Sequence, residues 1–129
     1  LATTLATPVL AHGDVSTQAG DTSDLPQLGE KWVEENPYRE TEAYDTAIEI
    51  GEQAYNQNCA RCHGLDAVSG GIAPDLRYLY SPDDDAYYIG RYQNGVIRNG
   101  MTYMPAFGET LGQEAGWAIR SWLDTVAEP

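Results

Sequence analysis

Positive charge is scarce in this 129-residue chain. It has 7 basic residues, of which Lys31 is the only lysine, against 20 acidic ones, and its formal net charge is −13. Proteins that bind nucleic acids need basic patches, and an anionic membrane surface repels a chain with this charge. Nucleic acids are therefore excluded as partners, and an anionic membrane surface is unfavourable.

Long hydrophobic runs are missing as well. No stretch of the sequence approaches the roughly 18 consecutive apolar residues that span a bilayer, so we expect no membrane anchor. A shorter run over residues 1–11 is uncharged and ends at Ala11. It is typical of the second half of a signal peptide and predicts cleavage before His12 and export from the cytoplasm. An ordinary N-terminal segment is the alternative.

One compact domain fits a chain of this length. We divide the sequence into a residual signal peptide (1–11), an N-terminal arm (12–40) and a main domain (41–129). The arm is polar, and its glycines and prolines interrupt any periodicity. We expect three side chains to hold it on the surface of the main domain: Trp32, Val33 and Tyr38.

Three helices are expected in the main domain, because apolar residues recur there at spacings of three and four. The first follows the N-cap Thr41 and ends near residues 56–58, and the last covers about 113–126. The middle helix runs from about Pro82 to Asn99, where Gly100 closes it. No segment shows a confident strand alternation, so the predicted architecture is all-α.

Three consecutive aspartates, Asp83, Asp84 and Asp85, open the middle helix. Acidic residues at this position interact favourably with the positive end of the helix dipole, which is the simpler interpretation. A calcium site is the alternative.

Three helices joined by long loops bury little apolar surface, so a large apolar group is needed to fill the domain. The segment Cys59-Ala60-Arg61-Cys62-His63 provides for one, because Cys-x-x-Cys-His is the haem attachment signature of c-type cytochromes. The two thiols add to the vinyl groups of haem and form thioethers, and the histidine binds the iron. One covalent haem c is therefore expected on Cys59, Cys62 and His63.

The alternatives to haem attachment are a disulfide between Cys59 and Cys62, a thioredoxin-type redox pair and a zinc site. A redox pair normally lies in a βαβ unit, and no parallel-strand pattern surrounds these residues. Zinc needs further soft ligands, but the sequence has no other cysteine, and its only other histidine is His12.

The second axial ligand of the iron is expected to be a methionine, and the sequence has two, Met101 and Met104. A thioether opposite histidine raises the reduction potential and leaves no open site, which favours electron transfer over oxygen chemistry. We favour Met104, because Pro105 fixes the backbone next to it. Met101 is then a packing residue.

These motifs resemble those of the monohaem class I cytochromes c, in which the first and last helices cross at a small residue beside an aromatic pair. Gly51 and Tyr55 on the first helix and Trp122 on the last occupy matching positions. The resemblance implies a class I cytochrome c fold with three main helices around the haem.

The same resemblance implies further residues around the haem. Pro74 matches the proline whose carbonyl accepts a hydrogen bond from the axial histidine and orients it. From their residue types and region, Arg77, Tyr88 and Tyr92 are candidates for binding the haem propionates.

A narrower resemblance covers residues 11–15, 28–32, 36–39 and 55–64. These segments are similar to the soluble periplasmic cytochromes c that accept electrons from quinoprotein alcohol dehydrogenases, the ethanol-type enzymes in particular. The resemblance implies a donor that holds pyrroloquinoline quinone (PQQ) and gives up its electrons one at a time. It also implies a periplasmic carrier that passes them to a downstream cytochrome or oxidase of the respiratory chain.

The sequence disfavours docking through a ring of lysines, because Lys31 is the only lysine and Arg61 is the cation expected near the haem edge. Long-range steering instead favours a partner with a positive patch. The sequence therefore predicts an electron carrier, not an enzyme. The alternatives are a carrier for another periplasmic dehydrogenase or oxidase, and a haem enzyme or gas sensor with a displaceable sixth ligand, against which Met104 argues.

Overall fold

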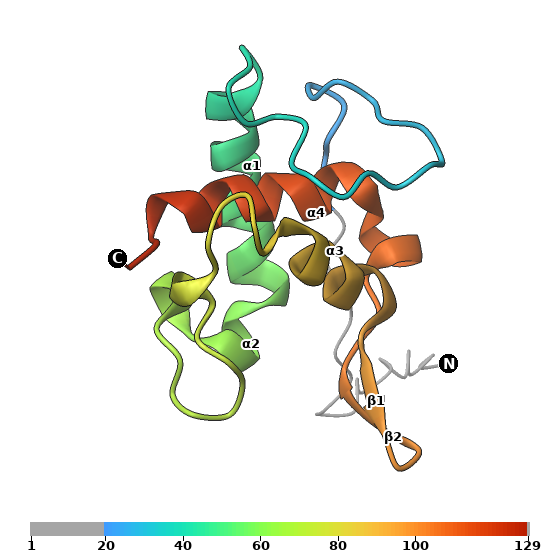
Figure 1. The fold of residues 1–129 in the computed structure, drawn as a ribbon, viewed down its shortest axis with the longest axis vertical. Coiled ribbons are helices and arrows are strands. Elements are labelled where there is room, and N and C mark those ends of the chain that lie inside the picture. The colour runs from blue at the N-terminus through green and yellow to red at the C-terminus, as the bar shows by residue number, and fades with distance from the viewer. Residues whose placement is uncertain (1–19, 129) are drawn as a thin grey trace, which may run out of the picture.

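The computed structural model describes residues 20–128, so the expected signal peptide, its cleavage before His12 and the start of the arm lie outside the described residues. The described chain is mostly helical (Figure 1). Its elements are α1 (Tyr44–Asn58), α2 (Ala60–His63), the 3-10 turns η1 (Leu65–Ala67) and η2 (Leu76–Tyr78), α3 (Asp85–Asn94), β1 (Val96–Arg98), β2 (Met101–Met104) and α4 (Gly108–Thr125). None of the helices in this part of the chain has the length and hydropathy that crossing a bilayer requires.

Helices α1 and α4 cross at the centre of the fold, and Figure 1 shows α4 running in front of α1. A Cβ atom at Gly51 would lie 1.9 Å from the carbonyl oxygen of Ala118, so only glycine allows the two backbones to touch here. Beside this contact, the ring centroids of Tyr55 and Trp122 are 4.5 Å apart. The crossing expected from the sequence is therefore confirmed.

The middle helix ends earlier than the sequence analysis predicts. Helix α3 stops at Asn94, and the chain continues as an antiparallel hairpin in which Arg98 pairs with Met101. Asn99 and Gly100 form its two-residue turn with φ angles of 52° and 76°. An Asn-Gly pair is the preferred sequence for such a turn. The expectation of a helix up to Asn99 without any strand was wrong, because Gly100 closes a hairpin turn and not a helix.

The final helix agrees better with its prediction. Helix α4 begins at Gly108, but Gly112 has non-helical φ and ψ angles of 86° and 169°. The continuous helical part after this break runs from Gln113 to Thr125, close to the predicted 113–126.

The described part of the arm, residues 20–40, has turns and bends but no helix or strand. Leu25 and Tyr38 are only 3% and 1% exposed, and Trp32 packs against the same buried cluster. Val33 is more exposed, at 37%. The arm therefore contributes side chains to the core in addition to covering the main domain.

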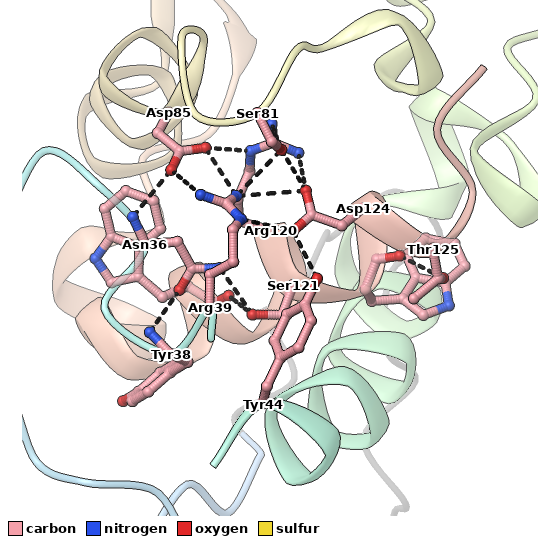
Figure 2. Close-up of polar contacts among 12 residues, drawn as sticks. Asn36, Tyr38, Arg39, Tyr44, Ser81, Asp85, Arg120, Ser121, Asp124 and Thr125 are labelled. Atoms are coloured by element: carbon pink, nitrogen blue, oxygen red, sulfur yellow. Dashed lines mark hydrogen bonds and ion pairs between the residues drawn. The ribbon is translucent and has the colours of Figure 1, made fainter. Parts of the chain in front are cut away.

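A buried ionic cluster ties the arm to three helices (Figure 2). The carboxylate of Asp85, at the start of α3, is inaccessible to solvent and accepts hydrogen bonds from Arg39 and Arg120, each at 2.8 Å. Asp124 on α4 accepts a hydrogen bond from Arg39 at 3.0 Å and one from the Tyr44 hydroxyl at 2.7 Å. Both oxygens of Asp85 accept hydrogen bonds from arginines, so this carboxylate is not available to the alternative calcium site.

The arginines also determine the charge state of this cluster. Burial raises the pKa of Asp85 and Asp124, but the hydrogen bonds from Arg39 and other donors outweigh it. The pKa of each carboxyl therefore lies below its usual value, and both stay ionised at neutral pH.

Candidate functional site

The two cysteines and His63 lie on one helical turn at the end of α1. Cys59 closes α1 through a hydrogen bond from its N–H to the carbonyl of Tyr55, and α2 follows directly. The His63 N–H donates to the Cys59 carbonyl at 2.9 Å, which keeps this turn compact. Cys59 is partly buried against the core, Cys62 is exposed, and both thiols are free, so the structure does not contain the alternative disulfide.

The imidazole of His63 is oriented by the loop that follows the motif. Its Nδ1 atom lies 2.8 Å from the carbonyl oxygen of Pro74. A carbonyl oxygen can only accept, so Nδ1 carries a proton, and in the neutral imidazole Nε2 keeps a free lone pair. The contact expected between His63 and Pro74 is thus present, and it leaves Nε2 able to bind a metal.

The two methionines occupy different environments on the hairpin. Met101 begins β2 next to the turn and is 64% exposed, whereas Met104 ends β2 and packs against the buried core. Just beyond Met104, the Phe107 N–H donates to the carbonyl of Tyr92 on α3 at 2.9 Å. The end of the hairpin that carries Met104 is therefore fixed to the body of the protein, as an axial ligand would require.

The three candidates for binding propionates have other partners in the structure. The hydroxyl of Tyr88 donates to the carbonyl of Gly116 at 2.7 Å, and that of Tyr92 donates to the carbonyl of Gly112 at 2.8 Å. Arg77 forms a 2.7 Å ion pair with Asp75. Both tyrosine hydroxyls donate their protons to backbone carbonyls in this arrangement. Contact between these three residues and a haem propionate therefore remains a prediction.

Exposed apolar side chains are concentrated around the same site. Of the ten large hydrophobic residues exposed in the described chain, eight lie in the loop after the motif or in the hairpin: Leu65, Val68, Ile72, Tyr78, Tyr80, Ile97, Met101 and Tyr103. Exposed apolar side chains gathered in one region often mark a binding site for a ligand or partner. A haem bound between these two segments would provide such a cover.

The chemistry of the donor set also fits haem c. Burial, with a smaller electrostatic contribution from Cys62, raises the pKa of the Cys59 thiol to about 12, so this thiol is uncharged at neutral pH. The motif offers two free thiols and an imidazole whose Nε2 is not hydrogen-bonded, and the end of the hairpin offers the thioether of Met104. Haem c is attached through thioether bonds to two cysteines, and a histidine and a methionine can serve as its axial ligands.

Sequence reasoning missed the hairpin that carries Met104. The signal was present in the Asn99-Gly100 pair, which is typical of two-residue hairpin turns. It also missed the support of the arm by Gln113, whose side chain contacts the backbone about 80 residues earlier. No local pattern in the sequence reports a contact of that kind.

Comparison with known proteins adds independent findings. The family described as "Cytochrome C oxidase, cbb3-type, subunit III" matches residues 46–123. Cytochrome c550 of Pseudomonas aeruginosa is 53% identical over 124 residues, which cover 95% of this chain and 86% of the relative. Quinohemoprotein alcohol dehydrogenase ADH-IIG of Pseudomonas putida is 39% identical over 80 residues, which cover 61% of this chain but only 11% of that enzyme.

Among solved structures, the fold is similar to that of cytochrome cL from the marine methylotrophic bacterium Methylophaga aminisulfidivorans. The TM-score is 0.56 at 24% identity, and the match covers 83% of this chain and 73% of that one. At this level of identity the likeness concerns the fold.

Proposed function

Since the chain belongs to the cytochrome c family, with a class I cytochrome c-like fold and one covalently bound haem c, we propose which residues hold the haem and which enzyme reduces it. The protein is an electron carrier, not an enzyme. Haem c, when bound, supplies an iron that accepts and releases a single electron.

In this proposal Cys59 and Cys62 form the two thioethers, and His63 and Met104 are the axial ligands. The observation that carries it is the 2.8 Å contact of His63 Nδ1 with Pro74, on the same helical turn as the two free thiols. This hydrogen bond holds the ring in one orientation and makes Nε2 a stronger donor. Met104 is favoured over Met101 because its side chain packs against the core.

The proposed electron donor is a PQQ-dependent alcohol dehydrogenase of the periplasm. The similarity to part of a quinohemoprotein alcohol dehydrogenase supports this proposal. The reduced quinone holds two electrons and the carrier takes one, so each alcohol oxidised requires two visits by oxidised carrier. The electrons then pass to a downstream cytochrome or oxidase.

Stopped-flow spectroscopy tests the donor. Oxidised holoprotein is mixed with a purified PQQ-dependent ethanol dehydrogenase and ethanol, and separately with a methanol and an amine dehydrogenase and their substrates. We expect the fastest reduction with the ethanol enzyme. Equal or faster reduction by another dehydrogenase would instead support a carrier for that enzyme and contradict the proposed pairing.

A further inference from the structure

The segment that carries Met104 lies directly against the end of α3. Gly95 follows α3 with a φ of +70°, and a Cβ atom built on it would lie 2.4 Å from the Met104 carbonyl oxygen and 2.8 Å from the Ala106 nitrogen. A few residues later, the Phe107 N–H donates to the carbonyl of Tyr92 at 2.9 Å. The position of the Met104 backbone therefore depends on where this end of α3 lies.

Aromatic rings hold that end of α3 in place. The ring of Tyr92 stacks on Phe107 with centroids 5.8 Å apart and contacts Trp32 of the arm at 6.3 Å. Trp32 also lines an open groove together with Ala106 and Gly108, the residues that follow Pro105. The indole ring of Trp32 thus lies next to both Tyr92 and the segment that follows Met104.

Trp32 is held by α4 through its neighbours in the chain. The side chain of Gln113, only 3% exposed, donates from Nε2 to the Lys31 carbonyl at 3.0 Å. Its Oε1 accepts hydrogen bonds from the Val33 N–H at 2.9 Å and from the indole N–H of Trp117 at 3.2 Å. One buried amide therefore fixes the backbone on both sides of Trp32.

We propose that Trp32 of the N-terminal arm is a positioning residue for the Met104 ligand. Held by Gln113, it supports Tyr92 and Phe107 and so limits movement of Met104 away from the iron. The inference rests on the proposed function, because it takes Met104 to be the axial ligand. It gives the arm a part in electron transfer, since an iron that keeps its methionine has no open coordination position.

Imidazole binding to the ferric holoprotein measures how readily the methionine is displaced. For Trp32→Ala we expect the affinity for imidazole to rise about two- to tenfold, the range that corresponds to the loss of one aromatic pair. The weak long-wavelength band of methionine-ligated ferric haem should disappear at correspondingly lower imidazole concentrations. Trp32→Phe keeps a ring at this position and should restore the affinity to within about twofold of the wild type.

Val33→Ala is the matched control. It changes the next residue of the arm, whose side chain is 37% exposed, and keeps the backbone N–H that donates to Gln113. We expect its imidazole affinity to equal that of the wild type. Thermal unfolding followed by circular dichroism is recorded for every variant, because a purely structural role would lower the melting temperature without changing the affinity.

Two results overturn the inference. One is an unchanged imidazole affinity in Trp32→Ala, whatever happens to its melting temperature, and the other is an equal rise in Val33→Ala. If Trp32→Ala yields no holoprotein, Trp32→Leu is measured against the same expectation. Failure of the ligand assignment is seen separately, since Met104→Ala would then leave the long-wavelength band in place.

Discussion

At the scale of single residues, the two methionines provide the sharpest contrast. Met104 packs against the core, whereas Met101 is 64% exposed. We expect Met104→Ala to open the ferrous iron to carbon monoxide, and Met101→Ala to leave it closed. Difference spectra recorded under carbon monoxide measure this directly. If both substitutions open the iron to carbon monoxide, or only Met101→Ala does, the assignment of Met104 as the axial ligand is wrong.

The buried carboxylate of Asp85 supports a second prediction at this scale. Asp85→Asn keeps the shape but removes the charge that Arg39 and Arg120 face. Breaking a buried pair by removing one partner costs about 3–5 kcal/mol, and we expect the free energy of unfolding to fall by this amount. Chemical denaturation of the holoprotein measures it. Asp83→Asn, at an exposed position in the same segment, is the control and should change stability by less than about 0.5 kcal/mol.

The lowered pKa of Asp85 and Asp124 gives this cluster a defined pH dependence. Each folded pKa lies below the unfolded value of about 3.9. At a pH between the two values, the unfolded state therefore binds more protons than the folded state. The stability that these groups contribute is therefore complete above the unfolded pKa and is lost as the pH falls through the folded one. Melting temperatures recorded between about pH 6 and pH 3 should fall more steeply for the wild type than for Asp85→Asn. Parallel curves would show that Asp85 does not contribute.

At the scale of helices, two glycine-to-alanine substitutions distinguish the effect of helix–helix packing on stability from the effect of helix propensity. Gly51 touches the backbone of α4, whereas a Cβ atom at Gly90 on α3 would meet nothing within 4 Å. We expect Gly51→Ala to lower the free energy of unfolding by about 3 kcal/mol or more, because the two helices must separate. Gly90→Ala should raise it by about 0.5–1 kcal/mol, as is typical of an open helical site. Equal effects in denaturation experiments would contradict the observed crossing.

The same scale shows what the sequence could and could not predict. Helices α1 and α4 follow from the spacing of their apolar residues, and the haem motif at the end of α1 from its cysteines and histidine. Helix α3 was extended too far because Gly100 resembles a helix stop, although Asn99 before it indicates a hairpin turn. The cluster of Arg39, Asp85 and Arg120 joins residues 35 and 46 positions apart. Such a cluster depends on the tertiary fold and has no local signature.

At the scale of the whole molecule, charge governs the approach of a partner. The net charge is −13 and Lys31 is the only lysine, so the chain lacks the positive ring that lysine-based docking needs. A donor with a positive patch is therefore favoured. We expect the second-order rate of reduction by the alcohol dehydrogenase to fall as ionic strength rises, because salt screens the attraction. Stopped-flow measurements over a series of salt concentrations give this dependence.

The anionic reductant ascorbate serves as the control for this experiment. Its reaction with the acidic carrier should become faster with salt, because screening then weakens a repulsion. A rate with the dehydrogenase that also rises with salt would contradict electrostatic attraction between the two proteins.

The proposed function depends on covalent attachment of the haem. A pyridine haemochrome spectrum of the protein, expressed with periplasmic haem attachment, tests it most directly. We predict a c-type haemochrome with one haem per chain, lost or reduced when Cys59 or Cys62 is replaced by alanine. A preparation that folds without covalent haem, or that retains it fully in both cysteine variants, would contradict the account.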